Sequence, residues 1–218
     1  MLALALWTGA CGGREEAPGD RATGADEATL PRGDVFGRAA AAVGGVPTVV
    51  VMRPIVPDSF AVGAGGTLGE EPAEGGAPTI DQFGLAFSPT LLVVDAGIPI
   101  TFTNSEGALT HNIHLRSIDR NESVFDEDAN SGDAVRVSLS EPGGYDVLCA
   151  MHPGMSGFIF VTDAPYTVFA DTDGSFSMGR VPQGTYEIRT WTRSAGYGPT
   201  DTLWVMGTGM EVDLSGLR

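Results

Sequence analysis

The chain contains no lysine, few histidines and few cysteines. Its 218 residues include 12 arginines, three histidines and two cysteines, against 28 acidic residues, and the formal net charge is −16. Because such an acidic protein repels phosphates, the composition argues against nucleic acid as a partner. No function follows from the absence of lysine itself. With so few histidines and cysteines, any site that combines imidazole and thiolate groups must be built from very few positions.

The apolar run at the start of the chain is too short to span a bilayer as an unassisted helix. It covers residues 1–10 and ends in small residues immediately before Cys11. This pattern resembles a bacterial lipoprotein signal, in which the cysteine is lipidated after cleavage. We therefore predict a signal segment over 1–11, export to the periplasm or another extracytoplasmic compartment, and a membrane anchor through a lipid on Cys11. The alternative is a frayed N-terminus of a cytosolic protein.

The next stretch has little that could form a core. Residues 12–45 are rich in Gly, Ala and acidic residues, which predicts a flexible acidic linker, with weak helical potential over 35–43. Residues 48–53 are mostly β-branched and predict the first strand of a domain that covers 46–162. Residues 63–78 predict a mobile insertion.

Short apolar or alternating segments then recur, separated by turn residues, as is typical of an all-β sandwich. The first series of expected strands covers 80–87, 90–95, 98–103, 111–116, 134–139, 145–149 and 157–161. A second series covers 166–170, 175–178, 185–191, 203–206 and 210–214. The second series predicts a small β-sandwich module over 163–218, which we expect to pack against the first domain because it is too short to bury a large core alone.

One loop carries three groups that can bind a metal. Cys149, His152 and Met155 follow one another in the spacing C-x2-H-x2-M, with Pro153 and Gly154 excluding a regular helix between them. A soft thiolate, an imidazole and a thioether together suit copper better than calcium, magnesium or manganese. A trigonal copper site would need one more histidine from elsewhere in the chain.

Strand alternation separates the two remaining histidines. If 111–116 is a strand, His111 points inward with Ile113 and Leu115, and His114 points outward. His111 is then the buried histidine and His114 lies at the surface. Asn112 is placed to hydrogen-bond across the site and fix the cysteine-bearing loop. Three apolar residues, Phe102, Met151 and Phe158, are expected to exclude water from the site.

Several motifs occur in a fixed order around these residues. They are Phe87-Ser-Pro89, Val94-Asp-Ala-Gly97, Ile100-Thr-Phe-Thr-Asn104, His111-Asn112, Pro142-Gly-Gly-Tyr145 and the Cys149 loop. Over 46–162 the chain resembles the cupredoxins, the blue copper family of plastocyanin, and its short loop is most similar to that of amicyanin. The resemblance implies a Greek-key cupredoxin β-sandwich with one type 1 copper ion. It also implies that His111, Cys149 and His152 are equatorial ligands and that Met155 is the weak axial ligand.

The ligand residues allow other interpretations. Zinc accepts cysteine and histidine, but it leaves Met155 without a role. A cysteine hydrolase would need a helix N-terminus or an oxyanion hole beside Cys149, and the sequence offers neither. Singly, Cys149 and Met155 are also ordinary core residues.

Two further segments carry weaker signals. Acidic residues at 126–128 and Asp133 predict a solvated loop, or a patch that steers a cationic partner. Asp171–Gly174 faintly resembles a calcium loop, but a hairpin turn is favoured. The run from Phe169 to Trp191 resembles carboxypeptidase regulatory-like domains of transthyretin-type β-sandwich fold, which carry no peptidase residues.

Taken together, these signals predict an exported blue copper protein that carries single electrons and is not an enzyme. The expected partner is a redox protein such as a c-type cytochrome or an oxidoreductase. One alternative is a copper-binding or delivery protein without a redox partner. The other is a metal-free interaction module.

Overall fold

The computed structural model describes residues 31–55 and 77–216. Within these ranges the chain is all β, with seventeen strands and no helix, so no described helix could cross a membrane. The all-β prediction is confirmed. The signal segment, Cys11, the linker before residue 31 and most of the 63–78 insertion lie outside the described residues.

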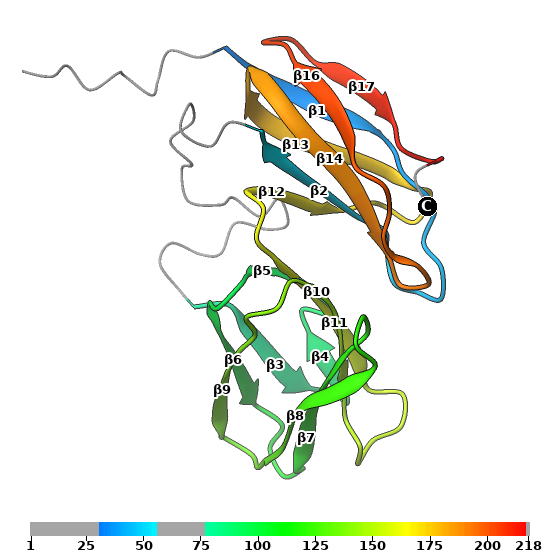
Figure 1. Cartoon of the computed structure of the whole chain (residues 1–218). Coiled ribbons are helices and arrows are strands. Elements are labelled where there is room, and N and C mark those ends of the chain that lie inside the picture. The colour runs from blue at the N-terminus through cyan, green and yellow to red at the C-terminus, as the bar shows by residue number, and fades with distance from the viewer. Residues whose placement is uncertain (1–30, 56–76, 217–218) are drawn as a thin grey trace, which may run out of the picture.

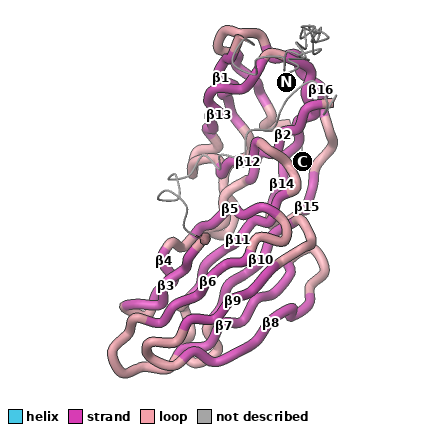
Figure 2. The backbone as a smooth tube through the Cα atoms, turned by 90° about the vertical axis from the view of Figure 1, so that its left-hand side faces the viewer, coloured by secondary structure: helices cyan, strands magenta, loops and turns pink. Residues whose placement is uncertain are grey.

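The strands form two bodies, one above the other in Figures 1 and 2. We call one of them the middle body, because its strands β3 to β11 lie in the sequence between the strands of the other, the flanking body. The middle body has two sheets, in the orders β4-β3-β6-β9 and β5-β11-β10-β7-β8. Its strands are β3 (Thr79–Phe83), β4 (Ala86–Ser88), β5 (Leu91–Asp95), β6 (Pro99–Asn104), β7 (His111–Ser117), β8 (Glu122–Ala129), β9 (Ala134–Ser138), β10 (Gly143–Leu148) and β11 (Ser156–Thr162). One hydrophobic cluster joins residues of both sheets, so the middle body is a β-sandwich.

The flanking body takes strands from both sides of the middle body in the sequence. Its sheets have the orders β13-β1-β17 and β12-β2-β14-β15, and β16 also pairs with β14. The strands are β1 (Arg32–Arg38), β2 (Val49–Pro54), β12 (Tyr166–Phe169), β13 (Ser175–Pro182), β14 (Gly184–Thr192), β15 (Gly196–Tyr197), β16 (Asp201–Val205) and β17 (Met210–Asp213). A second cluster, which includes Val35, Met52 and Tyr186, fills the space between these sheets.

Two expectations about the first described segments are wrong. The weak helix over 35–43 is in part strand β1, and the flexible linker over 12–45 includes this ordered strand. Residues 35–38 pair with β13 and β17, and this tertiary pairing overrides the weak local preference for a helix. Gly37 permits the approach, because a Cβ there would lie 1.8 Å from the Val212 carbonyl oxygen.

Strand β2 also lies outside the body to which the sequence assigned it. We expected residues 48–53 to open the 46–162 domain, but β2 pairs with β12 and β14 of the flanking body. A β-branched segment predicts a strand, but its own pattern does not specify which strand it pairs with.

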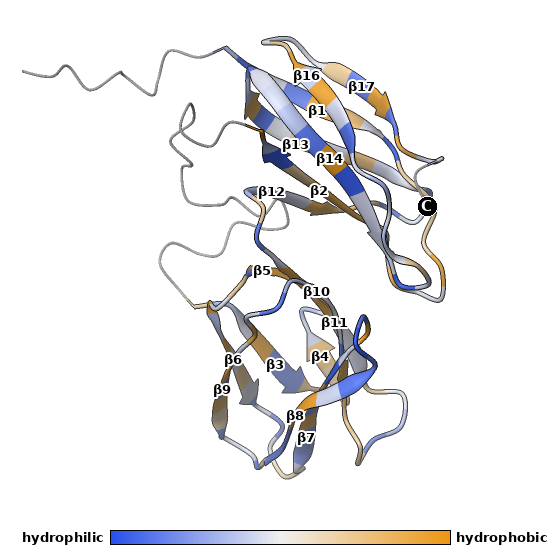
Figure 3. Ribbon diagram, viewed as in Figure 1, coloured by the Kyte–Doolittle hydropathy of each residue, from blue (hydrophilic) through white to orange (hydrophobic). Residues whose placement is uncertain are grey.

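Two details of the middle body differ from the predicted strands. The expected strand over 80–87 is a hairpin, because Gly84 and Leu85 have φ of 64° and 58° and form a two-residue turn between β3 and β4. The expected acidic loop at 126–128 is part of β8, which lies at the edge of its sheet. The hydrophilic colour of part of β8 is visible in Figure 3.

The two bodies meet through a third cluster of buried side chains. Trp191 of β14 is fully buried, stacks on Phe158 with ring centroids 5.6 Å apart, and meets Phe160 edge-on at 5.5 Å. Its Nε1 donates a hydrogen bond of 2.9 Å to Asp119. A Cβ on Gly144 would lie 2.4 Å from the Trp191 ring, so glycine allows this contact. The expected packing of the second module against the first is therefore present.

An ion pair reinforces the contact between the bodies. Arg193 binds the Asp146 carboxylate through both terminal nitrogens, and its second nitrogen lies 2.7 Å from Asp146 Oδ2. The hydrogen bond that Arg193 donates to the Asp146 carboxylate raises the pKa of Arg193. Asp146 lies on β10, the strand that leads to Cys149, so the flanking body contacts the strand that positions the metal-binding loop.

Candidate metal centre

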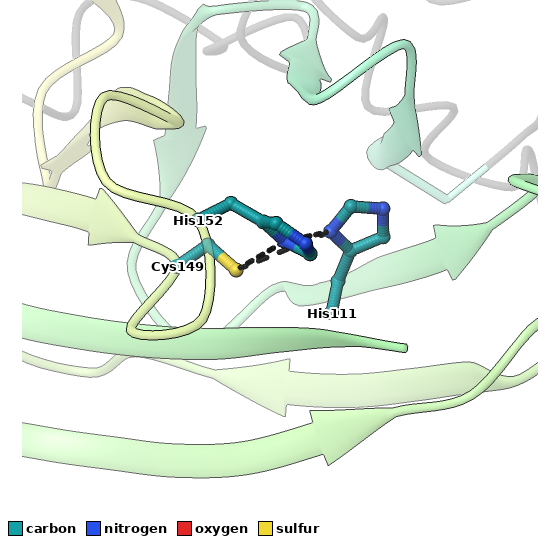
Figure 4. Close-up of side chains that lie close together, drawn as sticks. All are labelled: His111, Cys149 and His152. Atoms are coloured by element: carbon teal, nitrogen blue, oxygen red, sulfur yellow. Dashed lines mark hydrogen bonds between the residues drawn. The ribbon is translucent and has the colours of Figure 1, made fainter. Parts of the chain in front are cut away.

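Three of the predicted ligand residues lie together at one end of the middle body. The His111 and His152 Nδ1 atoms are 3.1 Å apart, and Cys149 Sγ lies 3.5 Å from His152 Nδ1 and 4.0 Å from His111 Nδ1. Figure 4 shows the two rings and the sulfur facing a common point. Among the described residues, this is the group of histidine, cysteine and acidic side chains that could hold a metal.

Strand β7 selects His111 over His114. His111, Ile113 and Leu115 are fully buried on the inner face, as alternation predicts. His114 is half-buried, outside the group, with its Nε2 3.1 Å from the Ser123 hydroxyl. The prediction that His111 is the buried histidine is confirmed.

Backbone hydrogen bonds fix the loop between β10 and β11. The Cys149 amide donates to the Met155 carbonyl at 3.2 Å, and the Met155 amide donates to the His152 carbonyl at 3.0 Å. Gly154 has φ of 96°, a left-handed conformation that favours glycine. The Met155 side chain is buried in the same hydrophobic cluster as Cys149.

Asn112 connects three parts of the site. Its backbone amide donates to Cys149 Sγ at 3.4 Å, and its side-chain oxygen accepts the Ala150 amide at 3.2 Å. Its Nδ2 donates to Asp126 Oδ1 at 2.8 Å and to Asp128 Oδ1 at 3.3 Å. Asn112 therefore holds the cysteine-bearing loop as predicted, and the acidic edge strand β8 holds Asn112.

The expected apolar surroundings of the site are only partly correct. Phe102 is buried in the cluster that contains Cys149. Met151 is 43% exposed, because the loop turns its side chain outward. Phe158 is buried, but it belongs to the cluster that contacts Trp191 on the other face of the sheet. Alternation along β11 gives the two faces but does not show which body covers each one.

The ligand atoms fit a metal ion. Metal bonds of about 2.0 Å to nitrogen and about 2.3 Å to sulfur, about 110–120° apart, place ligand atoms about 3.3–3.8 Å from one another. The three observed separations, 3.1, 3.5 and 4.0 Å, bracket this range. Two imidazoles and one thiolate are donors of a blue copper site, and Met155 is buried in the same cluster as Cys149.

Glu106 is the residue that sequence reasoning missed. Its Oε2 atom lies 3.7 Å from His111 Nε2, the nitrogen that faces away from the ligand group. Glu106 sits in the loop between β6 and β7, where no periodicity indicates which way a side chain points. Its position five residues before His111 was the only signal in the sequence.

Comparisons with known proteins agree with this geometry. Residues 76–162 match the family described as copper binding proteins, plastocyanin/azurin family. The chain is 31% identical over 102 residues to amicyanin-alpha of Methylorubrum extorquens, a match that covers 46% of this chain and 85% of that protein. It is 34% identical over 91 residues to plastocyanin A/B of Petroselinum crispum, which covers 34% of this chain and 82% of that protein.

Part of the chain is also similar to solved structures. A purple cupredoxin from Nitrosopumilus maritimus is 24% identical, with a TM-score of 0.35, and the match covers 39% of this chain and 99% of that one. Amicyanin from Paracoccus versutus is 22% identical, with a TM-score of 0.37, and the match covers 43% of this chain and 86% of that one.

The middle body with its His–Cys–His group is a Greek-key cupredoxin β-sandwich, as predicted from the sequence. The chain belongs to the plastocyanin/azurin family of copper-binding proteins. Copper is accordingly its cofactor. The family match ends at residue 162 and does not extend to the strands that follow it.

Proposed function

We propose that this protein carries single electrons through one type 1 copper ion and is not an enzyme. The observation that carries the proposal is the cluster of His111 Nδ1, Cys149 Sγ and His152 Nδ1 at one end of the sandwich. A bound copper ion would supply the Cu(II)/Cu(I) couple. His111, Cys149 and His152 would hold the ion, with Met155 as a further, weaker donor. Asn112 fixes the sulfur from outside this set.

The protein supplies a rigid and largely dry site. His111, Cys149 and Met155 are buried, and hydrogen bonds from the backbone and from Asn112 hold the loop. Such a frame keeps the donor atoms in place when the charge at the site changes. Little movement between two redox states favours fast electron exchange, which a carrier needs.

The partner surface of the carrier is the end where His152 lies. His152 is half-buried while His111 is fully buried, so His152 is the ligand nearer to solvent. Exposed Met151, in the same loop, and exposed Leu109, two residues before His111, give this end an apolar rim. We propose that a redox protein such as a c-type cytochrome or an oxidoreductase docks here. The net charge of −16 favours a cationic partner.

The remaining parts of the chain complete the proposal. Residues 163–218 form a carboxypeptidase regulatory-like sandwich that positions the copper domain, and β1 and β2 complete its sheets. The pairing of β2 with β14 and the buried contact at Trp191 support this arrangement. Residues 1–11 direct export to the periplasm, and a lipid on Cys11 tethers the protein to a membrane.

Copper binding and redox kinetics test the proposal. Cu(II) added to the purified protein is expected to give an intense visible band, a reversible one-electron potential and rapid self-exchange. Slow exchange combined with ready transfer of copper to an apo-acceptor would instead favour a delivery protein. A protein that stays colourless and metal-free would contradict both and favour an interaction module.

The two histidines of β7 should differ in their effect on copper binding. His111→Ala removes a buried ligand. Loss of a residue that only hydrogen-bonds a ligand already weakens metal binding by about tenfold or more, so we expect His111→Ala to weaken Cu(II) binding by at least about tenfold. His114→Ala on the same strand is the matched control and should leave affinity and spectrum unchanged. Calorimetric titration with Cu(II) measures both variants. Equal losses would mean that the strand faces are assigned wrongly.

A further inference from the structure

The second ring nitrogen of His111 has no hydrogen-bond partner. Its Nδ1 atom faces Cys149 and His152, whereas Nε2 is buried and makes no hydrogen bond. When Nδ1 binds a metal, Nε2 carries the proton and becomes a donor. A buried donor without an acceptor is costly, and ligating histidines almost always donate this N–H to a carboxylate, a carbonyl or water.

Glu106 offers the acceptor. Its Oε2 atom lies 3.7 Å from His111 Nε2, just beyond hydrogen-bond distance, and its side chain is 21% exposed. The same oxygen accepts the Gly84 amide at 2.6 Å and the Leu85 amide at 3.4 Å. These amides belong to the turn of the β3–β4 hairpin, so the carboxylate is fixed between that turn and the histidine.

Hydrogen bonds from Asn104 and to Asp81 fix the loop that carries Glu106. The Glu106 amide donates to Asn104 Oδ1 at 3.0 Å, and Asn104 Nδ2 donates to the Leu109 and Ala129 carbonyls. Asp81 accepts hydrogen bonds from Thr103 and from the hydroxyl and amide of Ser105. Burial works to raise the pKa of Asp81, but these hydrogen bonds outweigh it and the pKa lies below its usual value. Glu106 therefore has little freedom to turn away from His111.

We propose that Glu106 is a positioning residue of the copper site, which accepts the His111 Nε2–H and sets the orientation and donor strength of that imidazole. The inference rests on the proposed copper site and goes beyond its ligand set. The negative charge of Glu106 determines which oxidation state of copper the contact favours. A carboxylate on the imidazole makes His111 a stronger donor and places negative charge near the metal, and both effects favour Cu(II) over Cu(I).

Substitution of the carboxylate by an amide tests the charge while keeping the size and an acceptor oxygen. Glu106→Gln is expected to shift the one-electron equilibrium toward Cu(I) by about three- to tenfold, where tenfold corresponds to about 59 mV for one electron. Glu141→Gln is the matched control. It removes the same charge from an acid whose side chain is 66% exposed. Glu141 lies just before the first residue of β10, whereas Cys149 follows its last residue. Screening by solvent and salt should keep its shift below about twofold.

A second measurement observes the hydrogen bond itself. In the diamagnetic Cu(I) protein, the His111 Hε2 proton should give a downfield NMR signal that exchanges slowly with solvent. In Glu106→Ala this proton should exchange at least about tenfold faster, because its acceptor has been removed.

The results separate this inference from the proposed function. A blue Glu106→Gln protein with a potential that rises well beyond the Glu141→Gln shift supports the positioning role. A blue protein in which both shifts are equal, or in which His111 Hε2 exchange is unchanged in Glu106→Ala, overturns that role and leaves the carrier proposal intact. Failure of the wild-type protein to bind copper would remove both.

Discussion

Replacement of Cys149 by alanine is expected to abolish the visible absorption band of the copper-loaded protein completely. The band of a blue copper site arises from charge transfer between a thiolate and copper, and Cys149 supplies the sulfur of the ligand group. Asn112 donates its amide to this sulfur, and the Cys149 amide bonds to the Met155 carbonyl, so the loop orients Sγ toward both histidines. No rearrangement of the remaining donors could replace the thiolate.

A neighbouring sulfur provides the control for this experiment. Met151 lies in the same loop, but its side chain is 43% exposed and turned away from the group. Met151→Ala should keep the full band when Cu(II) is added. Cys149 is buried, and its truncation to alanine removes one atom from the core, so the folding of the variants must be checked. Circular dichroism of both copper-free variants provides this check. A band that survives in folded Cys149→Ala would rule out a type 1 site.

The copper loop and its buried histidine were predictable because local rules govern them. Pro153 and Gly154 exclude a helix, and alternation along β7 places His111 on the inner face. Both inferences use residues close together in the sequence. The ordered motifs around them added the fold, which the two sheets of the middle body then confirmed.

The remaining differences come from pairings between distant segments. The residues of β2 predict a strand, but its pairing with β14, more than a hundred residues away, decides to which body it belongs. The expected acidic loop at 126–128 is instead part of β8, where exposed acidic side chains at a sheet edge give no apolar alternation. Glu106 was missed because its contact with His111 depends on how a loop folds back.

The contact between the two bodies should contribute strongly to stability. Trp191→Ala removes a fully buried ring that packs on Phe158 and Phe160, and also removes its hydrogen bond to Asp119. We expect a loss of about 3–5 kcal/mol in the free energy of unfolding, the usual cost of truncating a large buried aromatic. Trp204→Ala is the matched control, because Trp204 lies in the same body on β16 and is 53% exposed. It should change stability by less than about 0.5 kcal/mol.

Denaturant unfolding of the copper-loaded protein, followed by both far-UV circular dichroism and the visible band, measures this contribution. If Trp191 joins the bodies into one cooperative unit, the two signals share a midpoint in the wild type and in Trp204→Ala. In Trp191→Ala they should separate, since the flanking body would unfold before the copper site. Equal stability of the two tryptophan variants would contradict the expected contribution of Trp191, and separate midpoints in the wild type would show that the bodies already unfold independently.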